Sequence, residues 1–204
     1  VYTEDNGFPG YAYAIVHDQV NELLTVFGEY YCNESDYDIY AYRMKSTDGT
    51  ADSSFGLNGW ATLRVAGSWE SIVSAIQLQE GKYYFGGYSD YYGDGDFFLG
   101  RINFNGYADT TFGEAGFVVT DFGNEDYLNE LALSPSGDVL YAAGYSTDFM
   151  DGTIIVSAYY TTAEITPPVT VAENESGSIK CFPNPSSGII TVETGLTGPY
   201  KVQV

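Results

Sequence analysis

The sequence contains little of the chemistry that enzymes and metal proteins commonly use. It has two cysteines, Cys32 and Cys181, and no CxxC pair, which argues against a disulfide framework and a cysteine-based zinc site. The two cysteines either pair outside the cell or remain independent. The single histidine, His17, stands at the expected end of a strand, where a structural or solvent-exposed role is favoured over that of a catalytic base. GxSxG, HExxH and P-loop spacings are also absent.

Basic residues and long apolar runs are scarce as well. Seven Lys and Arg stand against 28 Asp and Glu, which gives a net charge of −21 and predicts no nucleic-acid partner. No run reaches the roughly 20 apolar residues of a membrane span, so we expect no membrane insertion. The start, "VYTEDNGFPG", has neither the basic nor the apolar region of a signal peptide, and we expect that a precursor end has been removed. The acidic excess suits salty or divalent-rich surroundings outside the cell.

Aromatic residues and glycines are abundant. The chain has 20 Tyr, 12 Phe and 24 Gly, and aromatic residues between glycine turns favour pleated, half-buried strands. No segment of helical length shows a convincing 3.6-residue period. The composition therefore predicts an all-β fold.

The sequence repeats itself with a period of about 57 to 60 residues. "DGTADSSFGLNG" (48–59) aligns without a gap on "NGYADTTFGEAG" (105–116), and "DIYAYR" (38–43) aligns on "DFFLGR" (96–101). "AIQLQEGKYYFGGYSD" (75–90) matches "LALSPSGDVLYAAGYST" (131–147), and "AIVHDQVNELLTVFGEY" (14–30) is a degraded third copy. Residues 1–160 thus divide into three units, at approximately 1–66, 67–123 and 124–160.

Each unit reads as four short strands separated by Gly, Asn, Asp and Ser turns. In the middle unit we expect strands near 72–78, 82–88, 97–103 and 116–122. Four antiparallel strands in a unit of this length fit a propeller blade better than a solenoid rung, which contributes fewer strands.

The middle unit resembles the delta-60 repeat family of predicted β-propellers. The resemblance covers roughly residues 1–160; the first unit lacks the early turn glycine, and the third departs from the pattern after Tyr145. It implies a β-propeller-type fold, of which this chain carries about three four-stranded antiparallel blades in an incomplete ring. The matching residues are Gly81, Lys82, Gly87, Tyr88, Asp96, Phe97, Arg101, Asp109, Thr110, Thr111, Phe112, Gly113 and Gly116.

The residues that recur with the period are expected to be architectural, because a catalytic constellation would normally occur once. Gly59 and Gly116 are expected to supply turn conformations open to glycine. Phe55 and Phe112 are expected to fill the gap between neighbouring blades, and the acidic and hydroxyl residues before them to cap the turn.

The number of units is too small for a closed ring, because propellers close with four to eight blades. The first residues, "VYTED", resemble the last strand of a unit, "VVTDF" (118–122), and the third unit has no recognisable last strand. Either the chain is a fragment of a longer polypeptide, which we favour, or its first strand completes its final blade.

The tail changes character after the third unit. Residues 161–178 are rich in Thr, Pro, Glu and Ser and predict an extended linker. Residues 179–204 resemble the start of the β-sandwich C-terminal sorting domain (type A) of the type IX secretion system of Bacteroidetes. The resemblance implies export to the outer-membrane surface or the medium, with the type IX translocon and its shuttle as partners. The motif residues are Phe182, Pro183, Asn184, Pro185, Ser186 and Gly188, followed by the expected strand 189–192.

Acidic turns occupy the same place in successive units: "NESDYD" (33–38), "SDYYGDGD" (89–96) and "STDFMDG" (146–152). Solvated turns are the favoured interpretation. If a metal ion binds, oxygen ligands crowded on a turn suit calcium, and Asp90, Asp94 and Asp96 are the predicted ligands.

The composition and the resemblances favour a secreted or surface-exposed, non-catalytic binding, adhesion or scaffold module. Tyrosine runs such as "YYFGGYSDYY" could bind a glycan through flat aromatic faces, although packing between sheets is favoured for most of these rings. The ligand could equally be a protein. Two alternatives remain open: part of a larger surface glycan-degrading enzyme, for which no carboxylate pair stands out, and a subunit of an extracellular filament.

Overall fold

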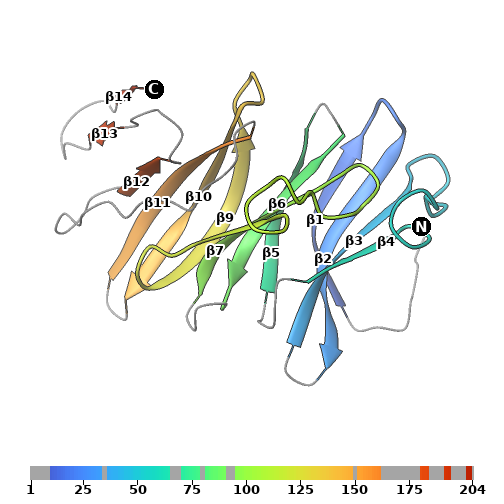
Figure 1. Ribbon diagram of the computed structural model, residues 1–204, viewed down its shortest axis with the longest axis horizontal. Helices are drawn as coiled ribbons and strands as arrows, with labels where there is room; N and C mark the ends of the chain where they lie inside the picture. The colour runs from blue at the N-terminus through green and yellow to red at the C-terminus, as the bar shows by residue number, and fades with distance from the viewer. Residues whose placement is uncertain are drawn as a thin grey trace.

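Every regular element in the described part of the chain is a β-strand, which confirms the all-β prediction (Figure 1). The computed structural model describes residues 10–33, 36–64, 70–78, 81–90, 95–148, 151–161, 180–183, 191–193 and 201–203. Within these residues, three sheets of four strands follow one another along the chain and a two-stranded sheet comes last. None of the described segments is a helix with the length and apolar character that crossing a membrane requires.

The first sheet is an antiparallel meander in which each strand pairs with the next one in the chain. Short turns connect its first three strands, so the pairing is local. Its strands are β1 (Gly10–Asp18), β2 (Leu23–Asn33), β3 (Asp36–Lys45) and β4 (Trp60–Leu63).

The second sheet repeats this meander, and its strands coincide with the four expected from sequence to within about two residues. The turn after the first strand uses Gly81, whose φ of 80° is open to glycine at little cost. The strands are β5 (Glu70–Gln77), β6 (Tyr83–Ser89), β7 (Asp96–Ile102) and β8 (Phe117–Thr120).

The third sheet differs from the expected four antiparallel strands. Its antiparallel part has three strands: β9 (Glu125–Leu133), β10 (Val139–Asp148) and β11 (Asp151–Tyr160). The fourth strand, β12 (Lys180–Pro183), comes from the tail and runs parallel to β11. A parallel neighbour requires a long connection, and the tail between Tyr160 and Lys180 is long enough to return the chain to the same end of the sheet.

The segment that resembles a sorting domain contributes three short strands. Phe182 and Pro183 of the motif lie in β12, whereas Asn184, Pro185 and Gly188 lie outside the described residues, as does the expected linker beyond Thr161. The last two strands, β13 (Thr191–Glu193) and β14 (Lys201–Gln203), form an antiparallel pair. β13 begins inside the expected strand 189–192.

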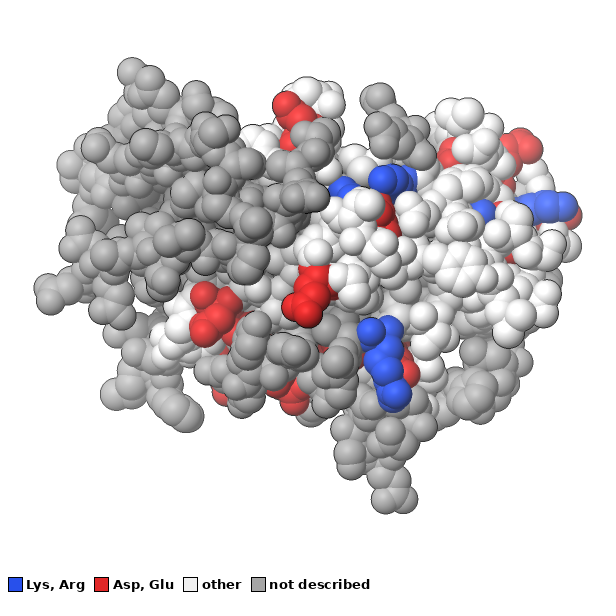
Figure 2. All heavy atoms as spheres, in the orientation of Figure 1, with Lys and Arg blue, Asp and Glu red and all other residues white. Residues whose placement is uncertain are grey.

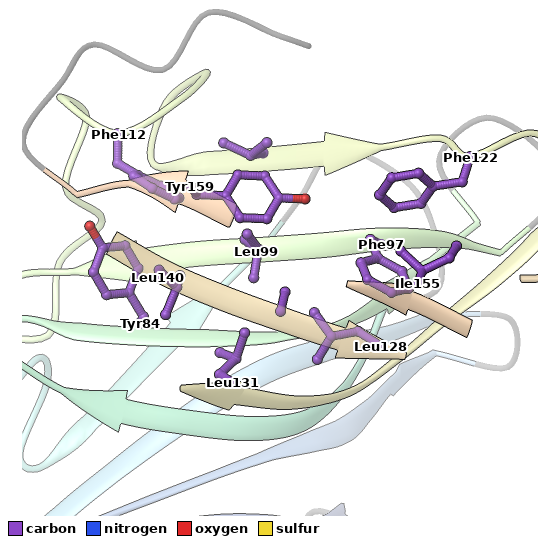
Figure 3. Close-up of a cluster of buried hydrophobic side chains, with 12 residues drawn as sticks. Tyr84, Phe97, Leu99, Phe112, Phe122, Leu128, Leu131, Leu140, Ile155 and Tyr159 are labelled. Atoms are coloured by element: carbon purple, nitrogen blue, oxygen red, sulfur yellow. The ribbon is translucent and has the colours of Figure 1, made fainter. Parts of the chain in front are cut away.

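The three sheets stand side by side, and a hydrophobic cluster fills each of the two gaps between them (Figure 1). The second sheet is buried on both faces because alternate residues of its central strands point to opposite sides. Tyr83 and Phe85 join the cluster with the first sheet, while Tyr84 joins the cluster with the third. Figure 3 shows this latter cluster, to which Leu99 of β7 and Leu140 of β10 both belong.

Candidate functional site

A buried arginine joins the first repeated turn to the second sheet. Arg43, at the end of β3, is fully buried, and its Nε donates a hydrogen bond of 2.8 Å to Asp52 Oδ2. The guanidinium lies 4.5 Å from the ring centre of Phe55, which is itself fully buried between the first two sheets. Its Nη1 donates to the backbone oxygen of Phe104, just after β7 of the second sheet, at 2.5 Å. We call this set of contacts the arginine latch.

The second unit repeats the arginine latch. Arg101 pairs with Asp109 at 2.8 Å and lies 4.9 Å from the ring centre of Phe112, which is buried between the second and third sheets. Its Nη1 donates to the backbone oxygen of Thr161, just after β11 of the third sheet, at 2.9 Å. Lys82 Nζ also reaches Asp109, at 2.8 Å. The repeated Asp, Phe and Arg therefore connect neighbouring sheets.

The glycines of the repeated turn have the backbone conformation for which they were singled out. Gly59 has a φ of 94° and Gly116 a φ of 104°, both in the region that favours glycine. The turn begins with an aspartate that accepts a hydrogen bond from the amide two residues later, Ser54 N to Asp52 Oδ1 in the first unit. These contacts fix the loop that carries the latch aspartate.

Two groups of tyrosine rings, which together we call the tyrosine ladder, come from the three sheets: Tyr11 and Tyr13 from the first, and Tyr88, Tyr127 and Tyr145 from the second and third. The rings of Tyr11 and Tyr13 are 6.2 Å apart, and those of Tyr88 and Tyr127 meet edge to face at 5.0 Å. Tyr127 stacks on Tyr145 at 5.2 Å. Tyr11, Tyr13 and Tyr145 are exposed to 59%, 48% and 39%.

The repeat and the strand register explain why these rings align. Tyr88 and Tyr145 each follow a glycine near the end of the second strand of their sheet, at equivalent positions of the two units. Tyr127 of β9 lies directly opposite Tyr145 of β10, so both side chains leave the same face of the third sheet. The contacts among Tyr88, Tyr127 and Tyr145 therefore follow from one repeated position and its cross-strand partner.

Carboxylates orient two hydroxyls of the ladder. Tyr13 Oη donates to Glu29 Oε1 at 2.8 Å, and burial together with this hydrogen bond raises the pKa of Tyr13 to about 12. Tyr127 Oη donates to Glu125 Oε2 at 2.9 Å, and this bond followed by burial raises the pKa of Tyr127 to about 12. Both phenols thus stay neutral across the physiological range.

The tyrosine run of the middle unit divides between core and surface. Tyr83 and Tyr84 are fully buried in the two hydrophobic clusters, which is the packing role favoured from sequence. Tyr88 belongs to the ladder. Residues 91 and 92 lie outside the described residues. The sequence run alone did not reveal the partners of Tyr88, because they come from a different unit.

Three carboxylates gather where the second and third sheets meet. Oxygens of Asp96, at the start of β7, Asp121, just after β8, and Asp126, in β9, all lie within 4.8 Å of one another. Asp96 and Asp126 are buried and Asp121 is exposed. Of the ligands predicted from sequence, Asp96 is in this group, Asp90 is exposed outside it, and Asp94 lies outside the described residues.

The close spacing of these three carboxylates is unfavourable when all of them are ionised. Two unit charges about 4.5 Å apart repel by about 4 kcal/mol at an effective dielectric constant near 20. Three ionised groups at such separations would therefore destabilise the fold by several kcal/mol in the absence of a cation or a bound proton. Asp121 and Asp126 were not predicted from sequence, since the strands that bring them to Asp96 belong to different parts of the repeat.

A shallow depression lies at the C-terminal ends of β1 and β5. His17, Asp18, Gln77 and Phe104 contribute to its lining, and Gln77 Nε2 donates to Asp18 Oδ2 at 2.8 Å. His17 is exposed, and the described residues of the lining include no Ser, Thr or Cys that it could activate. The backbone of Cys32 lies in β2 and that of Cys181 in β12; the positions of their sulfur atoms lie outside the description.

Comparison of the sequence with protein-family models and with curated proteins finds no match.

Proposed function

We propose that the chain is a non-catalytic binding and scaffold module, built as part of a β-propeller of delta-60-type repeats. Three consecutive sheets, of which the first two are four-stranded antiparallel meanders, are stacked face to face and joined twice by the same arginine latch, which supports a blade arrangement. The first strands β1, β5 and β9 lie next to one another, as the inner strands of successive blades do. The observation that carries the binding role is the tyrosine ladder, whose rings come from all three sheets and include the exposed Tyr11, Tyr13 and Tyr145.

We further propose that the protein is exported through the type IX route to the cell surface or medium. The support is the resemblance of residues 179–204 to a sorting domain, together with the strong acidic excess. The translocon and its shuttle would then be its transient partners. The proposal fails if the chain stays inside type IX-competent cells as fully as it does in cells that lack the translocon.

A neutral glycan is the ligand class that the ladder fits best. Exposed tyrosine rings offer flat apolar faces, and their hydroxyls offer hydrogen bonds to sugar hydroxyls. Carboxylates beside the ladder and a net charge of −21 disfavour sulfated or uronic-acid polymers. Among the described residues on the face drawn in Figure 2, Lys and Arg atoms occur in a few separate places, next to carboxylates. A protein ligand that lacks an acidic surface remains the second candidate.

Binding to a neutral-glycan array and to an affinity gel containing the best glycan tests this function. We expect Tyr88→Ala and Tyr127→Ala each to weaken retention about tenfold, since one buried ring face is worth roughly 1.4 kcal/mol. Tyr107→Ala is the matched control, because Tyr107 is 63% exposed but lies outside the ladder. An array without any binding, or equal losses in the ladder variants and the control, would contradict the glycan role.

A further inference from the structure

We propose that Asp96, Asp121 and Asp126 form a calcium site that joins the second and third sheets. Asp96 begins the third strand of the second sheet, Asp121 directly follows the fourth, and Asp126 belongs to the first strand of the third sheet. An ion bound by all three would link the two sheets at the start of β7, whereas Arg101 of the latch lies near the end of the same strand. The site does not depend on the glycan role.

A fourth oxygen, independent of the acidic group, is directed at the same place. Ser146 is buried, with 7% of its surface exposed, and its Oγ makes no hydrogen bond to any described residue. Ser146 of β10 lies directly opposite Asp126 of β9, so the two side chains leave the same face with Cβ atoms about 4.5–5.5 Å apart. That face points toward the second sheet, because Leu128, two residues after Asp126, packs in the cluster between the sheets.

Backbone amides hold the carboxylates in place. Phe122 N–H donates to Asp126 Oδ2 at 2.6 Å, and Gly123 N–H donates to Asp121 Oδ1 at 2.5 Å. The segment after β8 therefore fixes two of the three proposed ligands relative to each other. Because Asp121 is exposed, an ion has a route from solvent to the two buried carboxylates.

In the first unit, an arginine occupies the position that is equivalent to Asp121. Arg64 directly follows β4, just as Asp121 directly follows β8. Asp38 comes just before Ile39, which pairs with the last residue of β4. Asp96 likewise comes just before Phe97, which pairs with the last residue of β8. Arg64 Nε donates to Asp38 Oδ1 at 3.0 Å. Glu70 and Asp126 each lie opposite a serine in the second strand of their sheet. The triad equivalent to the proposed site is thus Asp38, Arg64 and Glu70.

The charges of the two triads identify the kind of ion. The first triad has a formal charge of −1 and the second a formal charge of −3, so a divalent cation in the second makes them equal. The ligands are oxygens alone, which suits calcium or magnesium rather than zinc or copper. Calcium accepts irregular sets of oxygen ligands, whereas magnesium demands near-ideal octahedral geometry and loses its waters reluctantly, so side chains fixed by the fold favour calcium.

Thermal unfolding of the full 204-residue chain in EGTA, in about 10 mM magnesium and in about 10 mM calcium tests the site. Calcium at about a hundred times Kd is expected to raise Tm by about 5 °C or more, and magnesium by less. Asp121→Asn should lose the calcium-specific shift. Asp121→Arg, which copies the first unit, should lose it as well and melt higher in EGTA than the native chain does.

Glu114→Gln is the control for general binding of calcium to the acidic surface, because Glu114 is an exposed carboxylate in the turn before β8. It should keep the full calcium shift. Arg64→Asp should create a calcium response at the first junction in addition to the existing one. The site is disproved if the native chain shows no calcium-specific shift, or if Asp121→Asn and Glu114→Gln respond alike.

Discussion

Arg101→Met is expected to lower the free energy of unfolding by about 3–5 kcal/mol, the usual effect of removing one partner from a buried ion pair. Arg101 is 6% exposed and donates to Tyr84 Oη and to the backbone oxygen of Thr161, both at 2.9 Å. Its loss leaves Asp109, which is 4% exposed, with Lys82 as its remaining cationic partner. Urea denaturation followed by far-ultraviolet circular dichroism measures the change.

The same substitution is expected to alter how stability depends on pH. Burial opposes ionisation of Asp109, but hydrogen bonds from Lys82 and Thr111 and the charge of Arg101 outweigh it and hold the pKa of Asp109 low. A carboxyl whose pKa is lower folded than unfolded stabilises the fold above about pH 4, and this contribution is lost as pH falls through the folded value. Arg101→Met should therefore flatten the loss of stability below pH 4.

Lys45→Met is the matched control for Arg101→Met, because Lys45 is an exposed cation at the end of β3. A change within about 0.5 kcal/mol is expected there. The latch would lose its assigned role if Arg101→Met destabilised the chain by less than about 1 kcal/mol and left its acid sensitivity unchanged.

Gly87→Ala is expected to destabilise the chain by about 3 kcal/mol or more, the upper range for overpacking against groups that cannot move aside. A Cβ at this position would overlap the backbone oxygen of Ser71 in the neighbouring strand. The close approach arises from a β-bulge in β5, between Ile72 and Ser74. Equivalent overlaps with backbone oxygens occur at Gly28 and Gly144, so one glycine per unit has the same role.

Gly152→Ala provides the control for Gly87→Ala within the same fold. Gly152 lies in β11, and a Cβ there would meet no atom within 4 Å. Its substitution should change the free energy of unfolding by no more than about 0.5 kcal/mol. Equal stability of the two variants in chemical denaturation would show that the bulged strands can adapt, against the rigid packing described here.

Local patterns were enough to predict the strands of the second sheet, because alternation and turn chemistry act over a few residues. Phe97 and Phe98, for example, are adjacent in sequence and enter different hydrophobic clusters, as the two-residue period of a strand requires. The fourth strand of the third sheet could not be predicted in this way. β12 comes from the tail and joins β11 only through a long-range parallel pairing.

The two candidate sites could be predicted only in part, for the same reason. Asp96 was singled out with neighbours in its own turn, but its partners Asp121 and Asp126 come from two other segments that meet when the sheets stack. The ladder likewise needs Tyr88 and Tyr127, which are on different sheets. The useful signal was present in the repeat itself: aligning Arg64 with Asp121 shows a cation replaced by an acid.

The stacking of the repeated sheets is tested most directly by nuclear Overhauser spectroscopy on the chain with its aromatic residues selectively labelled. The rings of Phe27 and Phe85 are 5.7 Å apart across the first junction, and those of Tyr88 and Tyr127 are 5.0 Å apart across the second. Cross-peaks within both pairs are the expected result. Their absence, in spectra that contain cross-peaks between rings of a single sheet such as Phe85 and Phe98, would contradict the face-to-face arrangement.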